Sequence, residues 1–556
     1  MPSGAELFVT CAKSLGIDTL FTLVGDHLNQ VLLAARRAGM RIIDFRHESA
    51  AAHAADAWAR LTRTPALVMV TGGPGHTNAL TGLATAYLAQ SPLILVSGAP
   101  ATAMAHRTVF QEIDQLAMAR PATKWAAQPA TAAQIPLMLT RAWSESVSGR
   151  MAPVHLSIPV DLFAAEATNP LPSLRPAEPA RPRPDPADVE RAMALLRGAE
   201  RPVVIAGSGV WWADARDELS KFLNRTRLPY YSITMARGMI SDLGRYAMGY
   251  ADPALNKAVR RAFLEADVVL VLGKRIDYRL ALGGPRLFSA EAKFIQVDIH
   301  TQELGRNRAL EVAICADVRE TLRAFAVALG QERWKPVGAW MRRLRRYNAE
   351  WRAELESFAA ETSTPLHPAA VYRAVLEAMP AETRISWDGG DFAHWGRAIV
   401  PAMVEGGWLR LGPLATIGAA LPNAVALKLQ NPDNPVALIT GDGALGFYLG
   451  EFDTLVRHKL PIAIITGNDA GWGIERELQR ALTGGETVAC ELSPARYDLV
   501  MQAFGGGGET VERYEAIAPA VSRAFEADRP YLVNIRTRGA RSPFTEWQLS
   551  GKQSRK

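Results

Sequence analysis

Two acidic side chains in the last third of the chain stand where they could hold a metal ion. The apolar run Val436–Thr440 ends in Gly441-Asp442-Gly443, and the next run, Ile462–Thr466, ends in Gly467-Asn468-Asp469. If both runs are neighbouring parallel strands, the two carboxylates emerge at the same edge of a sheet. Glycines beside Asp442 let backbone amides approach a phosphate, and carboxylates with phosphate oxygens suit octahedral Mg²⁺. The spacing predicts a magnesium–phosphate site, although Gly-Asp-Gly alone is also an ordinary turn.

A third acid, Glu48, is a candidate for proton transfer. It precedes an alanine-rich stretch that predicts a long helix, and a glycine-rich segment (residues 71–78, TGGPGHTN) follows that stretch. A buried carboxyl group keeps its proton more readily, because desolvation disfavours the anion. The alternative is a helix N-terminal acid that the helix macrodipole stabilises.

The elements that must position these acids are short apolar runs that alternate with helix-length stretches. The runs are Leu67–Val70, Leu93–Val96, His155–Ile158, Val203–Ile205, Val268–Leu272, Phe294–Val297, Val436–Thr440, Ile462–Thr466 and Tyr531–Ile535. Runs of this length, rich in branched residues, predict parallel strands covered by helices on both faces. We therefore expect an α/β protein with three doubly wound parallel-sheet domains.

Two breaks divide the chain. A proline-rich stretch at residues 168–188 predicts a stiff linker, and a second break precedes Pro365. The predicted domains are residues 1–168, 185–335 and 360–540. Residues 541–556 form a basic C-terminal tail, which is either a frayed end or a lid over an active site or an anionic ligand.

Composition excludes several classes of protein. The 556 residues are 48% hydrophobic and 21% charged, a mixture typical of soluble globular proteins. No long apolar run predicts a membrane span, and no signal peptide is evident. Three cysteines give no disulfide framework, so we expect a reducing, cytoplasmic environment. The net charge of +6 comes from arginines scattered along helices without any nucleic-acid-binding motif, so we expect neither a nucleic acid nor a membrane as partner.

The glycine and acid motifs near Asp442 and Asp469 resemble the diphosphate and metal motif of thiamine-diphosphate enzymes of the acetolactate synthase-like superfamily. The resemblance implies thiamine diphosphate and Mg²⁺ as cofactors, and Asp442, Asp469 and the Gly471 carbonyl as metal ligands. The family has Asn at the position of Asp469. The extra negative charge should tighten Mg²⁺ binding or require another cation nearby. The alternative is that the metal ligand is the neighbouring residue, Asn468, although this would shorten the spacing from Asp442. The cofactor-binding residues that the resemblance implies are Ala415, Ile417, Gly441, Asp442, Gly443, Ala444, Leu445, Asn468, Asp469, Gly471, Trp472, Gly473 and Ile474.

Two further segments extend the resemblance. Residues 46–56 (RHESAAAHAAD) are similar to the segment whose glutamate, here Glu48, shares a proton with the aminopyrimidine ring of the cofactor. Residues 412–422 (GPLATIGAALP) resemble the loop that bends the cofactor into a V. In that loop Ile417 would wedge between the two rings, and the Ala415 carbonyl would accept from the 4′-amino group. The alternative is that Ile417 simply packs into the hydrophobic core.

The resemblance implies three more catalytic residues. His27 matches an active-site His of benzaldehyde lyase and would handle protons, although a His in such a turn is also often structural. Gln111 matches a Gln that hydrogen-bonds substrate oxygen. Glu475 stands where pyruvate decarboxylases place an active-site Glu, or it simply pairs with Arg476 or Arg480 on one helix.

The whole pattern resembles 2-hydroxyacyl-CoA lyases and benzaldehyde lyase more than acetolactate synthase. We therefore expect a carbon–carbon lyase that releases formyl-CoA and an aldehyde or ketone from a 2-hydroxyacyl-CoA. The alternatives are a carboligase or decarboxylase that acts on free 2-oxo acids or acyloins, and a catalytically silent binding paralogue. The resemblance also implies a homodimer or homotetramer with active sites between subunits, and it leaves open whether a nucleotide occupies the central domain.

Overall fold

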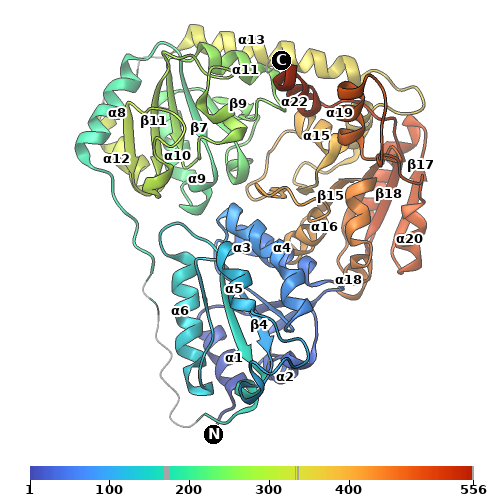
Figure 1. Cartoon of the computed structure of the whole chain (residues 1–556). Helices are drawn as coiled ribbons and strands as arrows, with labels where there is room; N and C mark the ends of the chain where they lie inside the picture. The colour runs from blue at the N-terminus through green and yellow to red at the C-terminus, as the bar shows by residue number, and fades with distance from the viewer. Residues whose placement is uncertain (168–175, 177, 332–333, 335–336, 554–556) are drawn as a thin grey trace.

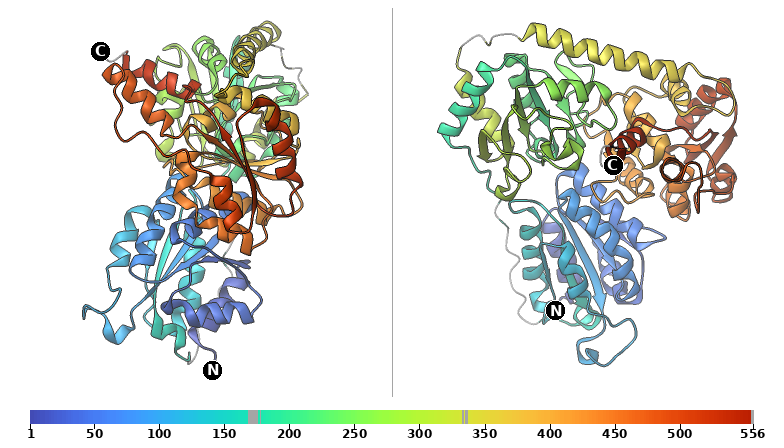
Figure 2. Two further views of the ribbon diagram at one scale, coloured as in Figure 1. Left: turned by 90° about the vertical axis from the view of Figure 1, so that its right-hand side faces the viewer. Right: turned by 45° about the horizontal axis from the view of Figure 1, so that its top comes forward.

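Three six-stranded parallel sheets make up the protein (Figure 1). The computed structural model describes residues 1–167, 176, 178–331, 334 and 337–553. Helices cover both faces of each sheet, so the predicted fold class is confirmed. Figures 1 and 2 show the first domain at one end of the molecule, with the other two side by side above it. Residues 168–175 and 177 of the predicted linker lie outside the described residues.

The first sheet has the strand order β2-β1-β3-β4-β6-β5. The order reverses between β1 and β3, and ligands bind at such a switch point, beyond the carboxyl ends of the strands. The strands are β1 (Thr19–Thr22), β2 (Arg41–Asp44), β3 (Ala66–Val70), β4 (Leu93–Ala99), β5 (Trp125–Ala127) and β6 (Val154–Pro159). The helices are α1 (Gly4–Ser14), α2 (Asn29–Arg37), α3 (Glu48–Thr62), α4 (Pro74–Ala89), α5 (Gln115–Ala119), α6 (Ile135–Val147) and α7 (Val160–Ala164).

The central sheet has a different order, β12-β11-β10-β7-β8-β9, whose switch point lies between β7 and β10. This is the order common to dinucleotide-binding folds. The strands are β7 (Pro202–Ala206), β8 (Tyr230–Ser232), β9 (Ala247–Tyr250), β10 (Val268–Leu272), β11 (Lys293–Asp298) and β12 (Val312–Cys315). The helices are α8 (Pro186–Gly198), α9 (Ser208–Trp212), α10 (Arg216–Thr226), α11 (Lys257–Glu265) and α12 (Val318–Leu329).

The third sheet repeats the order of the first, as β14-β13-β15-β16-β18-β17. The strands are β13 (Arg384–Trp387), β14 (Trp408–Arg410), β15 (Val436–Gly441), β16 (Ala463–Asn468), β17 (Gly507–Val511) and β18 (Tyr531–Arg536). The helices are α13 (Gly338–Ala359), α14 (Pro368–Ala378), α15 (Gly390–Ile399), α16 (Ala420–Gln430), α17 (Asp442–Leu445), α18 (Glu451–Arg457), α19 (Gly473–Thr483), α20 (Tyr497–Ala503), α21 (Ile517–Glu526) and α22 (Pro543–Gln553). Gly441 pairs with Gly467, so β15 and β16 end side by side.

Small residues let the domains pack closely. Helix α3 packs against α4 within the first domain and against α16 of the third domain. A Cβ atom at Gly82 of α4 would clash with Ala52 of α3, which shows how near the two backbones come. One apolar core joins the first and third domains, and another joins the central and third domains along α13. None of the described helices is long and apolar enough to cross a membrane.

The basic tail is a docked helix and not a frayed end. Helix α22 packs against α15 and α19 of the third domain. The ring of Phe544 packs at a tilt against that of His394, with ring centroids 4.1 Å apart, and Arg286 of the central domain lies over the ring of Trp547 at 3.5 Å. Residues 554–556 lie outside the described residues.

Candidate active site

A pocket lies beyond the carboxyl ends of β13, β15 and β16, close to the switch point of the third sheet. Of the residues predicted from the sequence, Ile417, Gly441, Asp442, Gly443, Ala444, Asp469, Gly471, Trp472, Gly473, Ile474 and Glu475 line it. The lining also includes Gly389, Gly390, Asp391, Phe392, Thr537, Arg538 and Ala540. All lining residues come from positions 368–540, so the first domain of the same chain contributes none.

Asp442 is the most buried acid of this pocket. It follows β15 directly, and its Oδ2 accepts a hydrogen bond from the backbone N–H of Gly471 at 3.2 Å. Burial and the nearby Asp469 carboxylate raise the pKa of Asp442 to about 7. A buried carboxyl group whose ionisation a neighbouring carboxylate disfavours fits a site completed by a cation. Within the described residues no group of three or more His, Cys, Asp or Glu side chains could hold a metal ion, so protein side chains alone do not form a complete metal site.

Asp469 and Asn468 have different surroundings. Asn468 is 1% exposed, and its amide donates to the Ala495 carbonyl and to Asn534 Oδ1, each at 3.0 Å. Asn468 is therefore absent from the pocket lining, whereas Asp469 belongs to it. Burial raises the pKa of Asp469, and its Oδ2 forms an ion pair with Arg476. This guanidinium places a cation directly beside the acid at position 469.

The loop before α16 presents Ile417 to the pocket. Asp388, which follows β13, holds this loop, because its Oδ1 accepts from the backbone N–H of Gly418 at 3.0 Å and of Gly389 at 2.8 Å. Burial raises the pKa of Asp388 to about 6. Ala415 has a φ of +59°, an uncommon conformation for alanine that turns the loop sharply. Ala415 and Leu445 are not among the lining residues, and Leu445 is core.

Three predicted catalytic residues meet at the switch point of the first sheet, around the loop that follows β3. His27 Nδ1 lies 2.8 Å from Thr71 Oγ1 and accepts from the backbone N–H of Gly72 at 3.3 Å. A Cβ atom at Gly73 would lie 2.9 Å from Gln111, and one at Gly75 would lie 3.4 Å from Glu48 Oε1. The sequence pattern places His27, Glu48 and Gln111 far apart, and the fold brings them to one loop.

The hydrogen bonds of this group fix the tautomer of His27 and orient Glu48. The backbone donor at Gly72 makes Nδ1 of His27 an acceptor, so the proton of the neutral ring sits on Nε2. Burial lowers the pKa of His27, which favours this neutral form. Asn78, a residue that motif reasoning did not single out, donates to Glu48 Oε2 at 3.0 Å. The Gln111 Oε1 atom is buried without a hydrogen-bond partner among the described residues.

Glu475 is exposed at the pocket, on the first turn of α19. The alternative in which it pairs with a helix arginine is wrong, because Arg476 pairs with Asp469 and Arg480 pairs with Glu477. Within the described residues Glu475 forms no ion pair, so its carboxylate faces whatever enters the pocket.

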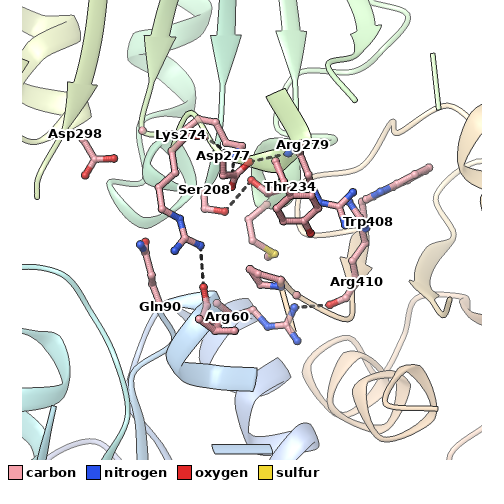
Figure 3. Close-up of a pocket in the computed structure, with 18 residues that line it drawn as sticks. Arg60, Gln90, Ser208, Thr234, Lys274, Asp277, Arg279, Asp298, Trp408 and Arg410 are labelled. Atoms are coloured by element: carbon pink, nitrogen blue, oxygen red, sulfur yellow. Dashed lines mark hydrogen bonds and ion pairs between the residues drawn. The ribbon is translucent and has the colours of Figure 1, made fainter. Parts of the chain in front are cut away.

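A second pocket lies where the three domains meet (Figure 3). It borders the switch point of the central sheet, where Gly209 N–H donates to the Gly273 carbonyl at 2.8 Å. Its charged lining comprises five cations and two carboxylates, namely Arg60, Lys274, Arg275, Arg279, Arg410, Asp277 and Asp298. Lys274 pairs with Asp277 at 2.6 Å, and Arg279 pairs with Asp252 at 2.7 Å. The excess of cations suits an anionic ligand.

The first and third sheets share one strand order, and acidic residues lie at the switch point of each: Glu48 in the first domain, and Asp442 and Asp469 in the third. The family comparison gives the cofactor. Residues 2–118, 189–325 and 388–535 match the N-terminal TPP binding, central and C-terminal TPP binding domains of thiamine pyrophosphate enzymes. The chain belongs to this family, and its cofactor is thiamine diphosphate, with which the family uses Mg²⁺.

Curated relatives span nearly the whole chain. The acetolactate synthase large subunit of Mycobacterium tuberculosis is 34% identical over 528 residues, 94% of each chain. The 2-hydroxyacyl-CoA lyase 2 of Homo sapiens is 31% identical, covering 96% of this chain and 89% of its own. The 2-hydroxyacyl-CoA lyase 1 of Mus musculus is 29% identical, covering 96% and 94%. The sequence pattern favoured the lyases over acetolactate synthase, whereas these identities do not favour either.

Proposed function

We propose that the protein is a thiamine-diphosphate- and Mg²⁺-dependent lyase that splits a short 2-hydroxyacyl-CoA into formyl-CoA and an aldehyde or ketone. The observation that carries the proposal is the combination of two neighbouring pockets. One holds the predicted cofactor-binding residues, and the other carries an excess of cations near the same loop, since Gly412 and Pro413 line it and Ile417 lines the first.

The cofactor, when bound, would act as an electron sink that stabilises negative charge on the former carbonyl carbon of the substrate. The side chains of this chain would bind it and move protons. Asp442, Asp469 and the Gly471 carbonyl would hold Mg²⁺ and the diphosphate. Glu48 would share a proton with the aminopyrimidine, oriented by Asn78. His27, Gln111 and Glu475 would hydrogen-bond the substrate oxygen and transfer protons to and from it.

The charge of the second pocket supports a CoA ester as the substrate. A phosphorylated carrier needs cations that are not already neutralised, and Arg275 and Arg410 line this pocket without a carboxylate partner among the described residues. Relatives named 2-hydroxyacyl-CoA lyase cover almost the full chain. Arg538, at the edge of the cofactor pocket, adds a further cation, although Glu361 pairs with it at 2.6 Å.

The second candidate is an acetolactate synthase- or benzaldehyde lyase-type enzyme that acts on free 2-oxo acids or acyloins. The observation in its favour is the 34% identity to an acetolactate synthase subunit. A catalytically silent paralogue is disfavoured, because Glu48, Asp442 and Ile417 are all present and a binding protein needs no activating glutamate.

We further propose that a second copy of the chain completes each active site. The first domain of the same chain contributes nothing to the cofactor pocket. Exposed apolar side chains flank both half-sites: Val24, Phe110 and Ile113 near His27 and Gln111 in the chain, and Leu414 and Phe447 near Ile417 and Trp472 of the third-domain pocket. A dimer that brings the first domain of one chain to the third domain of another would bury them.

The test is cleavage of short 2-hydroxyacyl-CoAs by purified protein with Mg²⁺ and thiamine diphosphate, with formyl-CoA and the carbonyl product measured. Cofactor-dependent formation of both products establishes the CoA lyase. Turnover of pyruvate or benzoin in its place keeps the cofactor chemistry and moves the function to the free-acid enzymes. Absence of turnover on every substrate, with the cofactor bound, favours the silent paralogue.

A further inference from the structure

Arg476 is a buried cation on the wall of the cofactor pocket. It lies on the first turn of α19 and is 6% exposed. Its Nη2 forms the ion pair with Asp469 Oδ2, and its Nη1 lies 3.3 Å from Glu491 Oε2 and 3.5 Å from the Asp469 carbonyl oxygen. Glu491 is largely exposed, so its charge is well hydrated. The principal partner of the buried guanidinium is therefore Asp469.

Two glycines make the space for this guanidinium. A Cβ atom at Gly471 would lie 2.6 Å from Nη1 of Arg476, and one at Gly539 would lie 2.6 Å from Nη2. The same Cβ atom at Gly539 would also lie 3.3 Å from Asp469 Oδ2. The guanidinium thus fits between two backbone segments and reaches the carboxylate from the side.

We propose that Arg476 is the fixed counter-charge that allows an acid at position 469 to act as a metal ligand beside a diphosphate. An aspartate adds one negative charge where the cofactor is already anionic, and an uncompensated buried charge is costly. With Arg476 on Oδ2, the pair is neutral overall and Oδ1 stays available for the metal. The neutral Asp469–Arg476 pair would then take the place of the neutral asparagine side chain that the family has at position 469. Arg476 acts through Asp469 and is a positioning residue.

A double-mutant cycle on the full-length protein tests this proposal. The variants are Arg476→Met, Asp469→Asn and the combination of both. The readouts are dissociation constants, measured by titration calorimetry, for thiamine diphosphate at fixed Mg²⁺ and for Mg²⁺ at fixed thiamine diphosphate. Arg476→Met leaves Asp469 uncompensated and should weaken thiamine diphosphate binding about tenfold or more. Asp469→Asn leaves the guanidinium unpaired and should weaken Mg²⁺. The double variant should return to within about threefold of wild type.

Two further variants control for the loss of an arginine elsewhere on α19 and for misfolding. Arg480→Met removes another arginine of α19, which pairs with Glu477 at 2.9 Å, and should leave both constants unchanged. Arg476→Lys keeps the charge and should bind better than Arg476→Met, even if the methionine variant folds poorly. Additive effects in the cycle, with the double variant as weak as the product of the single variants, would overturn the proposal.

The inference rests on the cofactor and metal sites of the proposed function and not on the substrate. Failure of the wild-type protein to bind thiamine diphosphate in a Mg²⁺-dependent way would refute the site assignment itself. Normal wild-type binding with an additive cycle would refute only the role of Arg476.

Discussion

Glu48 combines a buried position with a hydrogen bond from Asn78, which suits a group that must hold one proton in one place. Replacing it with glutamine keeps the shape and removes the acid. We expect Glu48→Gln to lower kcat by about 10²–10⁴-fold, while the dissociation constant of thiamine diphosphate stays near its wild-type value. Steady-state kinetics and calorimetry measure the two effects. Asn78→Ala, which only loosens the glutamate, should cost less activity. Equal activity of Glu48→Gln and wild type would remove Glu48 from the chemistry.

His53 of α3 is a buried histidine whose ring nitrogens both lack a hydrogen-bond partner among the described residues. Burial lowers its pKa to about 3. The unfolded chain therefore takes up a proton below about pH 6.5 while the folded chain does not, so this histidine makes folding less stable as the pH falls from 6.5 toward 3.

We therefore expect His53→Leu to stabilise the protein by about 1–2 kcal/mol at pH 7, because two unsatisfied polar atoms leave the core. Its advantage over wild type should grow by about 2 kcal/mol at pH 5. Denaturant unfolding at both pH values measures this. A variant that is less stable than wild type, with an unchanged pH dependence, would mean that the ring has a partner.

The sequence supplied the types and spacing of the site residues but not their partners. Asp442 and Asp469 could be predicted because each follows an apolar run and a glycine, a pattern that the sequence alone shows. Asp388, Asp391 and Asn78 were missed, since each acts through a hydrogen bond to a segment far away in the chain. From the sequence, Arg476 was considered only as a partner for Glu475, because helix spacing predicts pairs within one helix. Its actual partner, Asp469, lies before α19, where helix spacing makes no prediction.

At the scale of elements, helix α22 connects the chain terminus to the cofactor pocket. Ser542 and Thr545 are buried and donate to Asp391 Oδ1, through the hydroxyls at 2.5 and 2.6 Å and the Ser542 N–H at 3.1 Å. Burial raises the pKa of Asp391 to about 6, and these hydrogen bonds counter that rise. The tail, for which the sequence left open a frayed end or a lid, thus holds a residue of the cofactor pocket in place.

We expect Thr545→Val to lower the free energy of unfolding by about 1–3 kcal/mol, since it removes a donor from a buried carboxylate. Thiamine diphosphate should also bind more weakly, because Asp391 lines its pocket. Denaturant unfolding and calorimetry test both effects. The matched control is Ser550→Ala on the same helix, whose exposed hydroxyl contacts Trp547 and Arg286 but not Asp391, so thiamine diphosphate binding should not change. Identical behaviour of the two variants would argue against a structural role for the Asp391 contact.

All nine apolar runs chosen from the sequence are strands, and they include the buried centres of the sheets. The missed strands are shorter or more polar. β1 (Thr19–Thr22), β8 (Tyr230–Ser232) and β13 (Arg384–Trp387) lie inside sheets, yet each is short and its polar residues leave no long apolar run. β2, β5, β9, β12, β14 and β17 pair on one side only, so burial did not select an apolar pattern there. Strand order could not be predicted, because it depends on crossovers between distant segments.

At the scale of the whole molecule, the division of site residues between two domains makes subunit complementation informative. We expect mixed dimers of Glu48→Gln and Asp442→Asn chains to regain about half of the wild-type activity per dimer. One of their two sites would combine the intact first domain of one chain with the intact third domain of the other. Co-expression with two affinity tags isolates the mixed dimer, and each homodimer serves as the inactive control. A mixed dimer without activity would place each site within a single chain.

The narrow space around the Arg476 guanidinium also bears on how such proteins change during evolution. Neither Gly471 nor Gly539 can accept a side chain while the guanidinium lies between them. Loss of the arginine would release this restriction at Gly539, and gain of the arginine would require a glycine there first. We therefore expect positions 469, 476 and 539 to change together among homologues, with Asp, Arg and Gly inherited as one unit.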